Sequence, residues 1–323
     1  MIDGKKCIGI LTSGGDSPGM NAAIRSIVRT AINRDIVPLG VSRGYNGLLN
    51  KNFQVMTAKS VSNILKRGGT ILLTARCMEF HEEKYQKIAY ENCLEAGMDG
   101  LIVIGGDGSY NGAKKLSNLG LPCIGIPGTI DNDIACTEYT IGYDTAMNTV
   151  VEMVDKLNDT SQSHHRCSVV EVMGRHAGHV ALNTGIACGA IQIITEEVPV
   201  SVEEVAERIL EAKKRGKQHY IIIVSEGVGN AENIAKEIKA ITGIESRSSV
   251  LGHVQRGGAP TLRDRVTASA MGSQAVDLLE KGTGNRVLAI KNGQIVDLDI
   301  QEALEMQKGL DMNLYNVMRE IGY

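Results

Sequence analysis

The sequence lacks the features that would direct it to a membrane or to a nucleic acid. No apolar run reaches the length of a bilayer-spanning helix, and residues 1–6 show no signal-peptide pattern. The formal net charge is only −3 over 323 residues, which argues against nucleic acid as a main partner. We therefore expect a cytoplasmic protein with neither a membrane nor a nucleic-acid partner.

Paired cysteines are also missing. The seven cysteines are odd in number and scattered, with no Cys-x-x-Cys spacing and no histidine cluster. This pattern predicts neither a disulfide framework nor a structural zinc site, and most of the cysteines are expected to be small buried residues. A hydrophobic content of 43% is typical of a globular protein with a core, so disorder is not expected.

What the sequence does contain is an alternation of strand-length apolar runs with segments of helical period. Strands are expected at residues 7–11, 36–41, 100–104, 123–126, 167–172, 220–224 and 287–290. Helices are expected at residues 20–33, 82–96, 144–158, 202–215 and 264–281. Because the strands are continuously apolar, the sheets should be mostly parallel and covered on both faces. The sequence thus predicts an α/β protein with no flexible linker.

Two neighbouring strand ends carry the most informative residues. An apolar strand runs into Gly-Gly-Asp-Gly-Ser at residues 105–109, and a second runs into Pro-Gly-Thr-Ile-Asp-Asn-Asp at residues 127–133. Ligands of open α/β sheets bind at the carboxyl ends of strands, so these turns should lie side by side. Glycine lets backbone N–H groups approach phosphate, one carboxylate can hold Mg²⁺ and another can accept a proton. The pattern indicates phosphoryl transfer, with Asp107 on the metal and Asp131 as the base.

A third loop resembles a phosphate site but has a second interpretation. Residues 11–21 join the first strand to a helix, and Gly14 and Gly15 would allow an anion to approach the backbone. The loop is not a Walker loop, because it lacks the Gly-Lys-Ser/Thr ending. Both this loop and the turn at residues 105–109 could also need glycine only for the geometry of a strand-to-helix connection.

A second group of polar residues follows strands in the latter half of the chain. Residues 171–175, 225–227 and 251–258 each deliver an arginine, a carboxylate or a histidine, the set needed to bind a phosphate and sugar hydroxyls. Arg166 and Arg247 add guanidinium groups, whose rigid forks suit phosphate. Their joint placement at strand ends favours a sugar-phosphate site.

Single residues of these sets also have simpler interpretations. His253 could be a satisfied structural histidine, and Arg256 could be a surface cation. Arg25 and Arg29 lie four apart on one helix face, which is usually a solvated stripe, and the cations of residues 213–217 could complement a helix dipole. Either cationic group could instead serve an anionic effector.

Taken together, these residues resemble the bacterial ATP-dependent 6-phosphofructokinase family. The resemblance covers almost the full chain and rests on residues 11–23, 104–110, 127–133, 169–175 and 251–258. It implies two closely packed three-layer α/β/α domains, an ATP-binding domain at 1–141 plus 254–304 and a fructose 6-phosphate-binding domain at 142–253 plus 305–323. It also implies transfer of the γ-phosphoryl group of ATP to the 1-hydroxyl of fructose 6-phosphate in an allosteric, glycolytic homotetramer.

The resemblance assigns roles to individual residues. ATP would be held by Gly15, Arg76, Cys77, Gly106, Asp107, Gly108 and Ser109, with Mg²⁺ on Asp107. Catalysis would use Asp131, Thr129, Asp133 and Arg175. The sugar phosphate would contact Thr129, Asp131, Asp133, Met173, Gly174, Arg175, Glu226, His253 and Arg256, and would receive Arg166 and Arg247 from a neighbouring subunit. An effector site would use Arg25, Arg29 and Lys217.

The phosphoryl donor can be argued from two glycines. Relatives that use pyrophosphate are similar to this chain, but they carry aspartate where Gly108 stands and lysine where Gly128 stands. An acid at 108 would repel and crowd the α-phosphate of ATP, so the two glycines favour ATP. Pyrophosphate-dependent phosphofructokinase remains the alternative. One departure concerns the adenine, because bacterial members commonly have phenylalanine where this chain has Cys77.

A larger departure concerns regulation by ADP and phosphoenolpyruvate. Well-studied relatives carry arginine, arginine, glutamate and lysine where this chain has Ala58, Asn158, Ile191 and Gln218. Each lost charge-assisted bond is worth roughly 1.5–3 kcal/mol, so we expect weak or altered allosteric control.

Two further functions stay open at this point. Lipid and NAD kinases share the Gly-Gly-Asp-Gly turn but lack segments like residues 127–133 and 251–258. A non-catalytic subunit would bind nucleotide or sugar phosphate without turnover, but such paralogues tend to lose the base or the metal aspartate, and here both are present.

Overall fold

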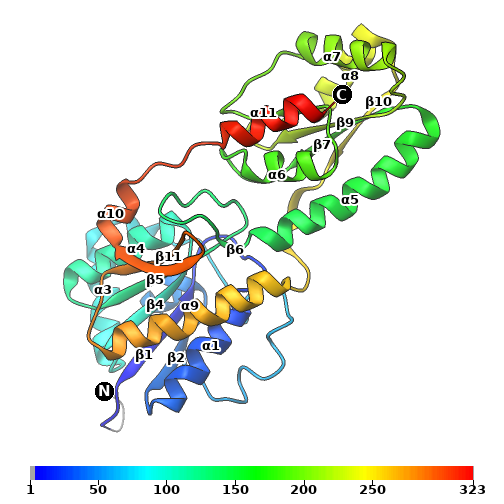
Figure 1. Ribbon diagram of the computed structural model, residues 1–323. Helices are drawn as coiled ribbons and strands as arrows, with labels where there is room; N and C mark the ends of the chain where they lie inside the picture. Colours follow the sequence, from blue (N-terminus) through cyan, green and yellow to red (C-terminus); the bar gives the residue numbers. More distant parts are fainter. Residues whose placement is uncertain (1–3, 323) are drawn as a thin grey trace. The chain divides into compact units, whose positions relative to one another are not determined.

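The computed structural model describes residues 4–322, which divide into two compact units (Figure 1). Unit 1 comprises residues 4–130, 134–145 and 256–308, and unit 2 comprises residues 131–133, 146–255 and 309–322. The chain therefore crosses between the units several times. No helix among residues 4–322 combines the length and apolar character that crossing a bilayer would require.

Unit 1 is built on one mostly parallel sheet in the order β12-β11-β5-β4-β1-β2-β3, with β6 paired to β5. Its strands are β1 (Cys7–Thr12), β2 (Val37–Val41), β3 (Phe53–Val55), β4 (Gly100–Gly105), β5 (Cys123–Thr129), β6 (Ile141–Gly142), β11 (Arg286–Lys291) and β12 (Gln294–Asp299). Only the pairs β2–β3 and β11–β12 are antiparallel. Its helices are α1 (Met20–Asn33), α2 (Gly44–Leu49), α3 (Glu83–Glu95), α4 (Asp107–Leu119), α9 (Leu262–Glu280) and α10 (Ile300–Glu305), with a 3₁₀ turn at Glu79–His81.

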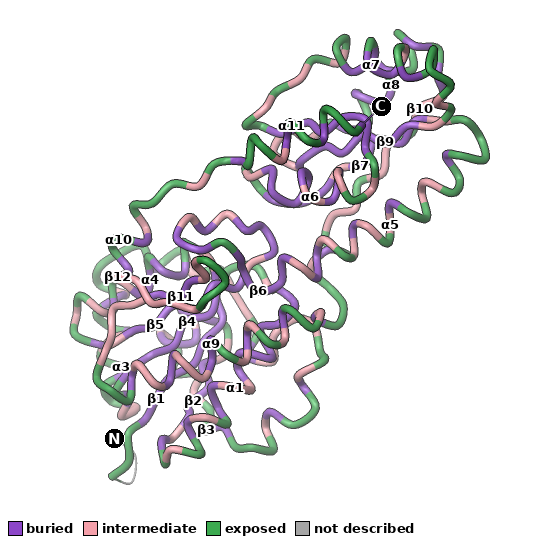
Figure 2. The backbone as a smooth tube through the Cα atoms, viewed as in Figure 1, coloured by how far each residue is buried: buried purple, intermediate pink, exposed green. Residues whose placement is uncertain are grey.

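Alternation along the strands of unit 1 places one set of side chains on each face of the sheet. Ile102 and Ile104 pack with α1 and α9 in one cluster, whereas Leu101 and Val103 pack with α2, α3, α4 and α10 in another. All four residues are fully buried. The sheet is thus the middle layer of three, as the continuous apolar runs predict (Figure 2).

Unit 2 has an all-parallel sheet in the order β10-β7-β9-β8. Its strands are β7 (Cys167–Val172), β8 (Gln192–Ile194), β9 (Tyr220–Ser225) and β10 (Ser246–Val250), and its helices are α6 (His179–Ala187), α7 (Val202–Lys214), α8 (Ala231–Thr242) and α11 (Met312–Ile321). Helix α5 (Tyr143–His164) begins in unit 1 and continues into unit 2, and a 3₁₀ turn spans Gly252–Arg256. Val169 and Ile222 pack with α7 and α8. On α6, Gly185 lies against Ile193 and Ile223.

The α/β class predicted from the sequence is therefore confirmed, with mostly parallel sheets covered by helices. Five of the seven cysteines are buried. Burial raises the pKa of the Cys93 thiol to about 12, so it behaves as a core residue rather than a nucleophile.

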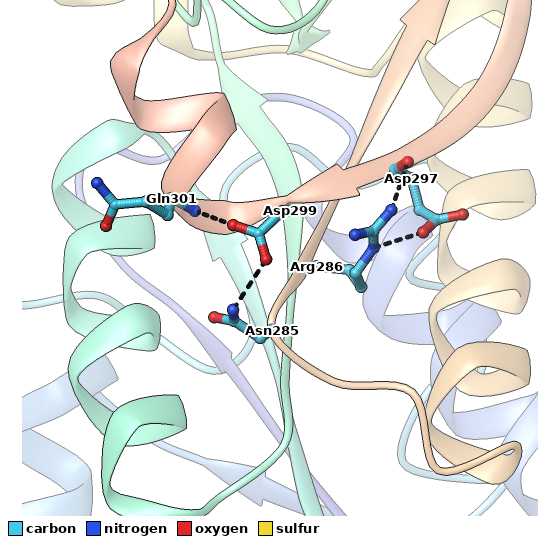
Figure 3. Close-up of polar contacts among 5 residues, drawn as sticks. All are labelled: Asn285, Arg286, Asp297, Asp299 and Gln301. Carbon is cyan, nitrogen blue, oxygen red and sulfur yellow. Dashed lines mark hydrogen bonds and ion pairs between the residues drawn. The ribbon is translucent and has the colours of Figure 1, made fainter.

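Polar side chains stabilise the antiparallel β11–β12 edge of the unit 1 sheet (Figure 3). Arg286 donates from Nε to Asp297 Oδ1 at 2.6 Å, and Asn285 donates to Asp299 Oδ2 at 3.0 Å. The second oxygen of Asp299 accepts the backbone N–H of Gln301, which caps α10. These bonds stabilise the β11–β12 hairpin. They lie away from the strand ends that carry the predicted site.

A buried carboxylate ties α9 to the segment that follows β5. Asp264, fully buried in the first turn of α9, accepts the backbone N–H groups of Gly142 and Thr145 at 2.8 and 3.0 Å, and the hydroxyls of Tyr139 and Thr145. Burial raises the pKa of Asp264, and the bonds from Thr145 and Tyr139 oppose that shift. Since β6 pairs with Gly128 and Thr129, this carboxylate supports the end of β5.

Candidate active site

Two glycine-rich loops of unit 1 meet at the carboxyl ends of β1 and β4. The backbone N–H of Ser13 donates to the carbonyl of Ile104 at 3.0 Å. A Cβ placed on Gly105 would lie 2.4 Å from Ser109 Oγ and 2.5 Å from the Ser13 carbonyl, so only glycine fits at that crossing. A Cβ on Gly14 would lie 3.7 Å from Ser109 Oγ. The turn at residues 105–109 and the loop after β1 therefore form one surface.

At this surface the backbone at the start of α4 is accessible. Gly106 caps the helix without a side chain, and Asp107 and Gly108 are exposed in its first turn. Nothing lies within 4 Å of a Cβ placed on Gly106 or Gly108. The first N–H groups of an α-helix lack intrahelical acceptors, and the helix dipole favours an anion at this end. This arrangement suits a phosphate with an accompanying cation at Asp107.

The segment before α3 crosses the same surface. Thr12 Oγ1 donates to the Leu73 carbonyl at 2.9 Å, and Thr74 Oγ1 donates to the Gly14 carbonyl at 2.7 Å. These bonds bring the next residues, the exposed Arg76 and the half-buried Cys77, to the loop after β1. Burial raises the pKa of the Cys77 thiol, so it offers a neutral contact. The expected nucleotide residues thus gather on one side of unit 1.

Gly128, next to Thr129 at the end of β5, is packed closely, unlike Gly108. A Cβ at Gly128 would lie 2.9 Å from Ile104 Cγ2 and 3.3 Å from Met20 Cε. The Thr129 carbonyl accepts a hydrogen bond from Thr140 at 2.7 Å. The two positions that the family resemblance associates with donor choice therefore differ physically, since position 108 has open space and a side chain at 128 would have to displace its neighbours.

In unit 2 the candidate residues follow the carboxyl ends of β7, β9 and β10. The backbone N–H of Arg175 donates to Glu226 Oε1 at 2.6 Å, and that of Met173 donates to Gln255 Oε1 at 3.1 Å. Arg175 has a positive φ of 53°, an uncommon backbone that these contacts support. Gly174 has φ 142°, and a Cβ there would lie 2.6 Å from the Ala177 carbonyl.

The acidic turn at residues 131–133 belongs to the same unit. Asp131 is 5% exposed, and its Oδ2 lies 3.7 Å from Arg175 Nε. Asp133 Oδ2 lies 3.9 Å from Nη1 of the same arginine. One guanidinium therefore faces both carboxylates.

Arg166 and Arg247 lie at the other end of the same sheet. Arg166 precedes β7, and Arg247 in β10 pairs in register with Ser168, the second residue of β7. A six-residue strand spans about 20 Å, so these arginines are separated from Met173 and Arg175 of their own chain by about the length of the strand. Arg247 is exposed and lies 3.5 Å from Glu245. Within one chain, the sheet holds the two sets of predicted sugar-phosphate residues apart.

Arg256 lies in unit 1, beside a residue expected to bind the nucleotide. Its Cζ and Nη1 are each 3.3 Å from the position of a Cβ on Gly15. His253, three residues earlier, is exposed in unit 2. The sequence grouped these two residues in one loop, and the structure assigns them to different units.

The expected effector residues are spread over both units. Arg29 and Ala58 line a pocket of about 540 Å³ in unit 1. Lys217 in unit 2 donates to the Gly322 carbonyl at 3.1 Å, and burial together with Arg208 lowers its pKa. Ile191 is fully buried in the core of unit 2, so this position offers no exposed group to an effector.

Sequence reasoning missed Asp264. The segment Thr261-Leu262-Arg263-Asp264 has the spacing of a helix capping motif, and Thr261 Oγ1 does accept the Asp264 N–H at 3.3 Å. That spacing could have placed the start of α9 at Leu262, two residues before the predicted start at residue 264. It gave no indication that the carboxylate itself accepts bonds from Tyr139, Gly142 and Thr145, more than a hundred residues away in the chain.

Comparison with known proteins gives one consistent result. Curated proteins named ATP-dependent 6-phosphofructokinase are 52% identical over 312 residues in Clostridium botulinum (97% of this chain, 98% of that protein) and 54% identical over 316 residues in Clostridium tetani (98% and 99%). The solved phosphofructokinase of Saccharomyces cerevisiae matches 98% of this chain with a TM-score of 0.88 and 35% identity, and the chain spans 48% of that longer protein.

A pyrophosphate-dependent phosphofructokinase structure from Marinobacter aquaeolei matches 95% of this chain and 86% of its own with a TM-score of 0.86, but at 22% identity it shows a shared fold alone. Residues 7–279 match the family described as phosphofructokinase. The chain therefore belongs to the phosphofructokinase family.

Proposed function

We propose that the protein is an ATP-dependent 6-phosphofructokinase of glycolysis. It transfers the γ-phosphoryl group of ATP to the 1-hydroxyl of fructose 6-phosphate and yields fructose 1,6-bisphosphate and ADP. The observation that carries the proposal is identity of 52–54% over nearly the whole chain with curated relatives of that name. The proposal includes a cytoplasmic location, where such a reaction meets its substrates.

Unit 1 is the proposed nucleotide-binding part. The open start of α4 and the loop at Gly14 and Gly15 supply backbone N–H groups to the phosphates, and Arg76 adds charge. Mg²⁺ usually takes one or two carboxylates and completes its shell with water and substrate phosphates. Asp107, exposed between two glycines with open space around them, fits that mode, and residues 4–322 hold no cluster of three or more His, Cys, Asp or Glu groups suited to a metal. The bound ion would neutralise charge on the phosphates.

Asp131 is the proposed general base. Its buried carboxylate would accept the proton of the 1-hydroxyl as that oxygen attacks the γ-phosphorus. Arg175 Nε lies 3.7 Å from Asp131, and its guanidinium would offer positive charge to the transferred group. Asp133 shares that arginine, and Thr129 precedes the acidic turn at the end of β5.

Unit 2 is the proposed sugar-phosphate-binding part. Five of the predicted residues follow the carboxyl ends of strands in its sheet: Met173, Gly174, Arg175, Glu226 and His253. Arg166 and Arg247 lie at the opposite end, which supports a site completed by these two residues from a second copy of the chain. The proposed assembly is a homotetramer.

ATP is favoured over pyrophosphate as donor because Gly108 and Gly128 stand at the two discriminating positions. The open space at Gly108 leaves room for the rest of the nucleotide. A coupled assay on fructose 6-phosphate should give turnover with ATP and at most a trace with pyrophosphate. Turnover with pyrophosphate alone would refute the donor assignment, and no turnover with either would favour a non-catalytic subunit.

A further inference from the structure

The loop after β7 holds Arg175 in a strained backbone conformation. Its φ of 53° is left-handed, and a residue with a side chain keeps such a backbone where its surroundings over-determine it. One support is Glu226, whose Oε1 accepts the Arg175 N–H at 2.6 Å. The Arg175 guanidinium is exposed and lies 3.7 Å from Asp131 and 3.9 Å from Asp133. Its direction therefore depends on how firmly the loop beneath it is held.

Two acids that follow β8 give this loop further support. Glu196 Oε2 lies 2.9 Å from Nδ1 of His176, the residue after Arg175. An ionised carboxylate can only accept a hydrogen bond, so the ring nitrogen is the donor. Glu197 Oε1 accepts the backbone N–H of Gly178 at 2.8 Å, at the start of α6. Neither acid lies in the segments that the sequence associates with the sugar phosphate.

Glu196 also packs against the loop after β9. A Cβ on Gly227 would lie 2.7 Å from Glu196 Cδ and 2.7 Å from the Arg175 carbonyl. A glycine is therefore needed between the acid and the Arg175 backbone. Since Gly227 directly follows Glu226, a single acid side chain lies against both loops that determine the position of Arg175.

The turn that carries the two acids is itself held in place. Thr195, directly after β8, is fully buried, and its Oγ1 accepts the backbone N–H of Val198 at 3.2 Å. This bond closes the turn around Glu196. A Cβ on Gly178 would lie 2.5 Å from Thr195 Cγ2, so the loop after β7 packs directly on this turn. All of these residues belong to unit 2, and the acids are presented from a fixed backbone.

The exposure of the pair argues against a main role in stability. The His176 side chain is 89% exposed and that of Glu196 is 37% exposed. Exposed ion pairs contribute little to the free energy of unfolding, because water screens them. The same contact can still orient a loop beside a reacting group, where a displacement of about 1 Å can lower a rate strongly.

We propose that Glu196 is a positioning residue for Arg175. Through His176 and Gly227 it holds the left-handed backbone that directs the guanidinium to the acidic turn at residues 131–133. This inference rests on the proposed function, in which Arg175 offers positive charge to the transferred phosphoryl group. Because that charge acts mainly in the transition state, loss of its position should lower kcat and leave the KM for ATP nearly unchanged.

A double-mutant cycle on the full protein tests this role. With ATP and fructose 6-phosphate, Glu196→Ala should lower kcat about fivefold and keep the KM for ATP within about twofold of wild type. Glu196→Gln keeps an oxygen that can accept the His176 proton and should recover most of the loss. His176→Ala should also lower kcat, and the two losses should not multiply in the double variant. Glu237→Ala, which removes an exposed acid of α8, is the matched control and should leave kcat unchanged.

Thermal unfolding separates positioning from stability. The unfolding midpoint of Glu196→Ala should stay within about 2 °C of wild type. A fall in kcat that accompanies a large fall in this midpoint would overturn the proposal, because the acid would then serve stability. Unchanged kcat in Glu196→Ala, or losses that multiply in the double variant, would also overturn it and leave the proposed function intact. A wild-type protein without turnover would contradict the proposed function itself.

Discussion

The strand ends of both units are proposed to bind phosphate-containing ligands, but the two units use different chemical groups. In unit 1 the residues proposed to bind a ligand are mostly glycines, and the space at Gly106 and Gly108 is open. In unit 2 they are charged side chains held by hydrogen bonds, such as Glu226 on the Arg175 backbone. A polyphosphate can be recognised by backbone N–H groups, whereas a sugar phosphate and a reacting hydroxyl need side chains in fixed positions. Substitutions should therefore act on charge and position in unit 2, and on available space in unit 1.

The largest effect is expected at Asp131. Asp131→Ser removes the proposed base and should lower kcat by about 10²- to 10⁴-fold, or roughly 3–5 kcal/mol of barrier. Steady-state kinetics at saturating ATP and fructose 6-phosphate measure it. Near-normal turnover in a folded variant would make the base assignment wrong.

A mixture of two inactive variants tests the proposal that the charged end of unit 2 serves a site shared between copies of the chain. Arg247→Ala alone should be nearly inactive at moderate fructose 6-phosphate, and so should Asp131→Ser. Mixing the two after partial denaturation should recover a fraction of wild-type activity, because some sites then receive Asp131 from one copy and Arg247 from the other. If mixtures stay as inactive as the separate variants, the two residues do not serve a shared site.

Asp264 should matter for stability more than for ligand contact. Asp264→Ala leaves the backbone N–H groups of Gly142 and Thr145 buried without acceptors, and each such group costs about 1–3 kcal/mol. We expect a fall of about 2–6 kcal/mol in the free energy of unfolding by urea. Tyr139→Phe removes one donor and keeps the carboxylate, so it should cost less. Equal stability of Asp264→Ala and wild type would mean that the cluster does not support the end of β5.

Substitutions at Gly108 test the role of the open space at this position of unit 1. Gly108→Asp should raise KM for ATP at least tenfold, because the carboxylate enters the space proposed for the nucleotide. Its stability should be unchanged or slightly higher, since nothing lies within 4 Å and an acid suits a helix N-terminus. Gly108→Asn, similar in size but neutral, separates crowding from charge. Unchanged ATP kinetics in Gly108→Asp would refute this account of donor choice.

The smallest effect is expected for ADP acting as an effector. With Ala58, Asn158, Ile191 and Gln218 in place of charged groups, and Lys217 bonded to Gly322, saturating ADP should shift the half-saturating fructose 6-phosphate concentration less than tenfold. The measurement is made at fixed ATP and Mg²⁺. A shift of tenfold or more would show that the remaining cations suffice for control.

Local patterns predicted the elements that carry the site. The bounds of β7 and α1 match the sequence prediction to the residue, because continuous apolar runs and an apolar helical face define them. The hairpin strand β12 was not predicted, since its half-buried residues give no strong pattern. The order of the strands and the bonds of Asp264 also could not be predicted, because they depend on contacts between distant segments.

The candidate site, too, could be predicted from the sequence only in part. The loops at Gly14, Gly106 and Glu226 could be found from glycine and charge at strand ends. The position of Arg256 beside Gly15 could not be predicted. In the sequence residues 251–258 form one motif, but the structure passes from unit 2 to unit 1 between Gln255 and Arg256.

The central claim is that Asp107 and Asp131 act on the same phosphoryl transfer. A crystal structure of the Asp131→Ser variant with Mg²⁺, ATP and fructose 6-phosphate tests it most directly. The account predicts a metal ion on Asp107 and the sugar 1-hydroxyl facing residue 131, with the γ-phosphate between them. Nucleotide and sugar bound in separate places, with residue 131 remote from the hydroxyl, would contradict it.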